Sequence, residues 1–179
     1  MTDTLVTTSF DAGTGVARLT FNRPEALNAI NVPLAEAFLA AVEHINSLSG
    51  VRCIVLAGTG RAFMAGGDVS SMVGTSEQAG KAIGAILDAV NPAILLLRSM
   101  DAPVITAVRG VAAGAGLSLT LMADLVIAEE DAKFLVAYNG IGAVPDCGGS
   151  WALAHKLGAG RASCCLLHTQ LLLLLRLPV

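Results

Sequence analysis

The chain has 179 residues, of which 54% are hydrophobic and 14% are charged, and its formal net charge at pH 7 is −3. This length and apolar content suit a single domain with one sizeable core. A small negative charge without a basic cluster argues against a nucleic-acid partner. Residues 1–4 lack a basic segment followed by an apolar run, so no secretory signal is expected.

The cysteines predict neither a metal centre nor a disulfide framework. Their spacing does not match metal-ligand motifs, and two of the four are adjacent in the sequence: Cys53, Cys147, Cys164 and Cys165. We therefore expect reduced thiols, no metal-binding residues and a cytoplasmic location.

The first elements are two short strands, over 5–10 and 16–21, joined by a glycine-containing turn that predicts a hairpin. Asn31 can cap a helix that has Pro33 in its first turn. Apolar residues then recur every three or four positions, which indicates an amphipathic helix with His44 on its solvent side. These apolar residues are Leu34, Phe38, Val42, Ile45 and Leu48.

The middle of the chain alternates between apolar runs and helical patterns. We expect strands over 53–57, 104–108, 125–128 and 133–135. A short helix should end at Met72, and a longer one should span 77–98 with a kink or break at Pro92. A further helix is expected to start at Leu117. This periodicity alone indicates an α/β fold with a mainly parallel sheet.

Two glycine turns each join an apolar strand to a helix start. One is Ala65-Gly66-Gly67-Asp68, and the other lies within 110–116. Small residues allow backbone amides to approach a ligand, and the first amides of a helix lack intrahelical acceptors. The two turns could each offer one amide to a single carbonyl oxygen, or could only allow close helix packing. The glycine spacing at 110, 114 and 116 does not match a dinucleotide-binding fingerprint.

Three segments resemble the crotonase superfamily of enoyl-CoA hydratases and isomerases. They are FNRPEALNAIN (21–31), RAFMAGGDV (61–69) and VRGVAAGAGLSL (108–119), in matching order and spacing, and the resemblance runs from residue 5 to about 161. It implies a core domain over 1–162, folded as a spiral of β-β-α repeats. It also implies a coenzyme A thioester as substrate with no separate cofactor, no membrane association, and a homotrimer or a dimer of trimers.

The resemblance also implies roles for individual residues. The thioester oxygen would lie between the backbone amides of Gly67 and Ala115, which would stabilise an enolate. The other implied substrate contacts are Arg23, Ala62, Ala65, Asp68, Gly114 and Tyr138. From the residues alone, Arg23 could equally be a surface arginine, Asp68 could hold a turn, as could Asp124, and Tyr138 could belong to the core.

The two glutamates of the hydratases match Ser118 and Tyr138, and neither of these can act as a carboxylate. Asp146 matches an acid that some isomerases of the family use, and the segment AYNGIGAVPDCGGSW around it resembles the ring-opening isomerases of phenylacetate degradation. One carboxylate suffices for an allylic proton shift, so an acyl-CoA isomerase is expected. The alternatives are an Asp146 that only caps the next helix and an inactive acyl-CoA-binding or interaction subunit.

Residues 163–179 form an apolar tail with five consecutive leucines that does not match the family. The tail is too short and too interrupted for a membrane span. A frameshift, an early stop, a mis-read sequence or a natural short variant would each account for it. The family's C-terminal helical part is therefore expected to be missing or altered.

Overall fold

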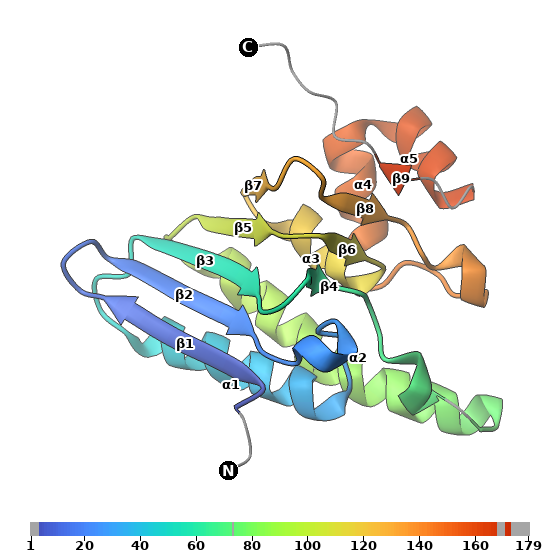
Figure 1. Cartoon of the computed structure of the whole chain (residues 1–179), viewed down its shortest axis with the longest axis horizontal. Coiled ribbons are helices and arrows are strands. Elements are labelled where there is room, and N and C mark those ends of the chain that lie inside the picture. Colours follow the sequence, from blue (N-terminus) through green and yellow to red (C-terminus); the bar gives the residue numbers. More distant parts are fainter. Residues whose placement is uncertain (1–3, 73, 168–170, 173–179) are drawn as a thin grey trace.

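The computed structural model describes residues 4–72, 74–167 and 171–172, which form two β-sheets and the helices packed around them (Figure 1). The first sheet has five strands in the order β1-β2-β3-β5-β7. Their bounds are β1 Val6–Asp11, β2 Val16–Phe21, β3 Cys53–Gly58, β5 Val104–Val108 and β7 Leu125–Ala128. β1 and β2 form the expected antiparallel hairpin, and all the other pairings in this sheet are parallel.

The second sheet has four short strands in the order β4-β6-β8-β9. They are β4 Ala62–Met64, β6 Val111–Ala113, β8 Lys133–Leu135 and β9 Leu171–Leu172. The β4–β6 and β6–β8 pairs are parallel, and β9 pairs antiparallel with β8. The predicted strands included β8 but neither β4 nor β6, because these three-residue strands lie within glycine-rich segments that show no clear alternation.

Two long helices pack against each other and lie along one side of the first sheet (Figure 1). Helix α1 (Val32–Ser47) begins as predicted, with the Asn31 side chain accepting from the N–H of Leu34 at 3.0 Å. Helix α2 (Ser76–Ser99) begins with a capping box formed by Thr75 and Gln78. It continues through Pro92, which is exposed, so the predicted break does not occur.

By length and composition, α2 is the one helix among the described residues that could cross a membrane. One face of its C-terminal half belongs to the protein core: Ile86, Ala89, Val90, Ala93, Ile94 and Leu97 are buried there. An amphipathic helix of a globular protein buries one such apolar face against the core.

The remaining helices are α3 (Ala115–Met122), α4 (Gly149–Leu157) and α5 (Ala159–Leu167). Single 3₁₀ turns occur at η1 Pro24–Ala26, η2 Val69–Met72 and η3 Asn139–Ile141. Helix α3 begins at Ala115 and not at Leu117, because Gly114 is the N-cap and the small residues after it are already helical. The expected boundary after Ala162 lies inside α5, and residues 168–170 and 173–179 of the tail are outside the described residues.

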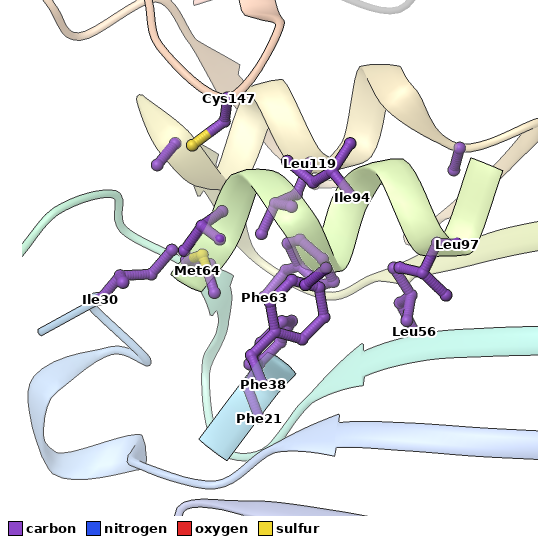
Figure 2. Close-up of a cluster of buried hydrophobic side chains, with 14 of the residues drawn as sticks. Phe21, Ile30, Phe38, Leu56, Phe63, Met64, Ile94, Leu97, Leu119 and Cys147 are labelled. Atoms are coloured by element: carbon purple, nitrogen blue, oxygen red, sulfur yellow. The ribbon is translucent and has the colours of Figure 1, made fainter. Parts of the chain in front are cut away.

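Aromatic and aliphatic side chains from both sheets and from α1, α2 and α3 meet in one core. The ring of Phe21 lies 5.2 Å from that of Phe38 and 6.0 Å from that of Phe63, measured between centroids. Figure 2 shows these rings together near α2, with Cys147 at the far end of the same buried cluster. Cys147 thereby anchors the segment before α4 to the core.

Candidate functional site

Two tight turns lie side by side where β4 and β6 end. Because these strands are parallel neighbours, the turns Gly66-Gly67 and Gly114-Ala115 leave the same edge of the second sheet. A Cβ atom on Gly66 would lie 3.1 Å from the carbonyl oxygen of Ala113, and one on Gly114 would lie 3.6 Å from the Cα of Gly66. Gly66 and Gly114 also have φ values of 105° and 50°. The positive φ values therefore favour glycine at both positions, and at Gly66 the close approach of the Ala113 carbonyl favours it as well.

The amide of Gly67 faces away from Ile30, which forms a parallel bridge with Gly67. Ile30 donates its N–H to the carbonyl of Gly66 and accepts from the N–H of Asp68, each at 2.7 Å. The N–H of the middle residue in such a bridge points to the opposite side, here the side of β6 and α3. Ala115 opens α3, where its amide has no intrahelical acceptor, and its nitrogen would lie 3.7 Å from a Cβ on Gly66. The Gly67 and Ala115 amides therefore belong to two turns that lie side by side at the same edge of the second sheet.

An ion pair connects the Gly67 turn to the segment after β2. Nη1 of Arg23 donates to Oδ2 of Asp68 at 2.7 Å and to the carbonyl of Ala29 at 2.9 Å. The hydroxyl of Ser70 and then the Arg23 guanidinium hold the pKa of the Asp68 carboxyl below its usual value. These two predicted substrate-binding residues thus contact each other, and their contact braces the turn that carries Gly67.

Asn28 supports the same region, although the sequence interpretation did not single it out. Its side chain is fully buried and donates to the carbonyls of Thr59, Ala62 and Phe63 at 3.0, 2.9 and 3.2 Å. Its Oδ1 accepts from the N–H of Arg23 at 2.8 Å. Asn28 has a left-handed backbone conformation, with φ of 57°, which asparagine tolerates better than most residues. The sequence signal that could have identified it is therefore an asparagine in a short loop that contains a proline.

Replacing Asn28 with alanine should lower the free energy of unfolding by about 3 kcal/mol, because buried carbonyls lose their donor and the left-handed conformation becomes strained. Chemical denaturation measures this change. Asn46→Ala, at an exposed position of α1, is the matched control and should change stability by less than about 0.5 kcal/mol. Equal effects of the two substitutions would contradict the bracing role of Asn28.

The two alanines that are predicted to contact substrate, Ala62 and Ala65, lie at the two ends of the segment 62–65. Ala62 is buried in β4, and its carbonyl accepts from Asn28. Ala65 follows β4 and donates its N–H to the carbonyl of Leu27 at 3.0 Å. The main chain between β4 and Gly67 is therefore held by the loop after β2, and Ala65 leads directly into the glycine turn.

A second cluster joins Ser118, Tyr138 and Asp146, which lie far apart in the sequence. The hydroxyl of Tyr138 donates to Oδ1 of Asp146 at 2.6 Å and lies 2.9 Å from Oγ of Ser118. Ser118 comes from α3, Tyr138 directly precedes η3, and Asp146 lies in the turn before α4. Burial first, and then the nearby Asp146 carboxylate, raise the pKa of Tyr138 above its ordinary value. The phenol is therefore a neutral hydrogen-bond donor.

The Asp146 carboxylate does not cap α4. The N-cap of this helix is Gly148, which makes no side-chain capping bond, whereas the backbone carbonyl of Asp146 accepts from the N–H of Gly149 at 2.8 Å. The capping interpretation of Asp146 is thus wrong, because its side chain turns toward Tyr138. The adjacent Cys147 is buried, and burial followed by the Asp146 charge raises the pKa of its thiol.

The turn that carries Asp146 lies directly against α3. A Cβ atom on Gly149 would collide with Oγ of Ser118, and one on Gly148 would lie 2.9 Å from Sδ of Met122. The same helix contributes the Ala115 amide at its first residue. Helix α3 therefore links the amide pair to the carboxylate cluster. Within the described residues, no three His, Cys, Asp or Glu side chains gather to hold a metal ion.

The enoyl-CoA hydratase/isomerase family model matches residues 11–172. A 1,2-epoxyphenylacetyl-CoA isomerase of Escherichia coli is 39% identical over 152 residues, covering 83% of this chain and 57% of the relative. A protein of Rhodobacter capsulatus named "Probable enoyl-CoA hydratase" is 38% identical over 161 residues, covering 87% and 59%. A solved Thermobifida fusca structure in complex with acetoacetyl-CoA has a TM-score of 0.81 at 29% identity, covering 94% of this chain and 68% of its own.

These comparisons show both the extent and the chemical ambiguity of the match. The chain spans less than three fifths of the length of the two curated relatives. One of those relatives is named an isomerase and the other a hydratase.

Proposed function

Because the chain belongs to the enoyl-CoA hydratase/isomerase family, we propose that it is an isomerase that moves a double bond in an enoyl-CoA thioester. The observation that carries this proposal is the Ser118–Tyr138–Asp146 cluster. Hydration needs one group to activate water and another to deliver a proton to carbon, whereas isomerisation needs one base that moves one proton. Asp146 is the carboxylate of the cluster; it accepts from the hydroxyl of Tyr138, which in turn contacts the hydroxyl of Ser118.

The proposed reaction uses an enolate whose charge is stabilised by backbone amides. The N–H groups of Gly67 and Ala115 donate to the thioester oxygen, and each contributes about 3 kcal/mol to the stability of the enolate-like transition state. The position of Ala115 at the start of α3 adds the favourable end of the helix dipole. A methyl group at Ala115 is compatible with this role, since the donor is the main chain.

Asp146 moves the proton. Its carboxylate removes a proton from the α carbon of a 3-enoyl thioester, which leaves a dienolate and a carboxylic acid. The acid then returns the proton to the γ carbon, which gives the 2-enoyl thioester with no gain or loss of atoms. The remaining proposed substrate contacts are Ala62, Ala65 and Gly114 near the two turns and Tyr138 beside the acyl chain, with Arg23 and Asp68 shaping the Gly67 turn.

Assembly into a trimer or a pair of trimers is part of the proposal. Large apolar side chains are exposed on α2, β7 and α4, namely Leu95, Leu125, Ile127 and Trp151. Contact with further copies of the chain would cover this apolar surface.

Assays of the purified chain with 3-enoyl-CoA and 2-enoyl-CoA substrates test this function. We expect measurable migration of the double bond from the 3 to the 2 position and negligible hydration of the 2-enoyl thioester. Efficient hydration would contradict the proposal. Binding of the thioester without either reaction would instead identify an acyl-CoA-binding protein, and a calorimetric titration with a non-reactive acyl-CoA provides that measurement.

A further inference from the structure

The hydroxyl of Tyr138 can bridge Ser118 and Asp146 in only one donor arrangement. A neutral phenol has a single proton, and an ionised carboxylate only accepts hydrogen bonds. The 2.6 Å contact with Oδ1 of Asp146 therefore uses the phenol proton. The 2.9 Å contact must then run from the hydroxyl of Ser118 to the phenol oxygen. The resulting chain of donors runs from Ser118 through Tyr138 to Asp146.

This chain of donors is buried and fixed at its beginning. Ser118 is 1% exposed and Tyr138 is 6% exposed. Ser118 lies in the first turn of α3, with its N–H bonded to the carbonyl of Gly114 at 3.0 Å, and its Oγ lies against Gly149. Asp146 is consequently held relative to the same helix whose first residue, Ala115, provides a proposed oxyanion donor.

We propose that Tyr138, itself oriented by Ser118, is a positioning residue that fixes one carboxylate oxygen of Asp146 and leaves the other oxygen to take the substrate proton. This inference rests on the proposed isomerase function.

Tyr138→Phe keeps the ring and removes the hydroxyl. We expect kcat to fall about 10- to 100-fold, which corresponds to the loss of a hydrogen bond to a charged group, with little change in KM. Ser118→Ala should lower kcat by a smaller factor, again with little change in KM.

Thr120→Val is the matched control for the two hydroxyl deletions. Thr120 is buried on α3 like Ser118, but its hydroxyl donates to the carbonyl of Gly116 and not to the cluster. This variant should retain the parent kcat and KM, with thermal melts confirming folding of all three variants. A Tyr138→Phe protein with the parent kcat would overturn the inference, as would a Thr120→Val protein with the same fall in kcat.

The chain contains a single tyrosine, so its phenol can be observed without any activity. With ¹³C at the ring carbon that bears the hydroxyl, one NMR resonance reports on Tyr138. At neutral pH this resonance should move in Asp146→Asn, where the carboxylate that accepts the phenol proton is replaced by an amide, and it should stay in place in Asp88→Asn, whose side chain is exposed on α2. An unchanged resonance in Asp146→Asn would overturn the inference. If Asp146→Asn remained fully active, the proposed function would fail, while the NMR result would still decide whether the phenol of Tyr138 bonds to Asp146.

Discussion

Replacing Asp146 with asparagine is expected to lower kcat for double-bond migration by about 100- to 10,000-fold, because the amide cannot take and return a proton. The substitution preserves the size of the side chain and an oxygen that can accept from the Tyr138 hydroxyl, which lies 2.6 Å from Oδ1 of Asp146. Steady-state assays with a 3-enoyl-CoA measure the change. Affinity for a non-reactive acyl-CoA should remain close to that of the parent chain.

Asp88→Asn provides the control for this experiment, since Asp88 is exposed on α2 and lies outside the proposed site. It removes the same charge and should leave kcat unchanged. Full isomerase activity in a folded Asp146→Asn protein would exclude Asp146 as the base. An equal loss in Asp88→Asn would show that net charge, rather than the cluster, governs turnover.

Gly67→Pro should lower kcat by about 100-fold, because proline removes one of the two amides that we assign to the enolate oxygen. The hydrogen bonds around Gly67 involve the N–H groups of Ile30 and Asp68, so they persist without the Gly67 amide. The loss should therefore appear in turnover more strongly than in thermal stability. Single-turnover kinetics and melting curves of the variant separate these two effects.

Ala65→Pro is the informative comparison, since the Ala65 amide donates to the carbonyl of Leu27 at 3.0 Å. This proline should destabilise the fold, whereas Gly67→Pro should mainly impair catalysis. Unchanged turnover in a folded Gly67→Pro protein would rule out the assignment of its amide.

The long elements could be predicted because their signals are local. The cap at Asn31 is a side-chain bond three residues along the chain, and the helical spacing after it places Leu34, Phe38 and Val42 in the core. Pro92 lies on the exposed side of α2, and the helix continues through it without a break. The sequence could not show this, because the effect of the proline depends on which face of the helix its ring occupies.

The carboxylate cluster could be predicted only in part. Family resemblance singled out Ser118, Tyr138 and Asp146 separately, each by comparison with an acid in other members. The bonds among them join residues that are 20 and 8 positions apart, and they depend on the fit of the turn before α4 against α3. Asn28 was missed for the same reason, since the three carbonyls to which its side chain donates lie more than 30 positions away along the chain.

The bracing of the two glycine turns has a consequence for the energetics of each reaction cycle. Bonds on both sides of the proposed amides hold the turns: Ala65 to Leu27, Asp68 to Ile30, Gly114 to Leu135 and Ser118 to Gly114. The conformational entropy of these turns is consequently lost once, when the chain folds. In the reaction that we propose, an arriving thioester would meet donors that are already oriented, so its binding energy would not be consumed in ordering the main chain and would remain for alignment of the acyl group.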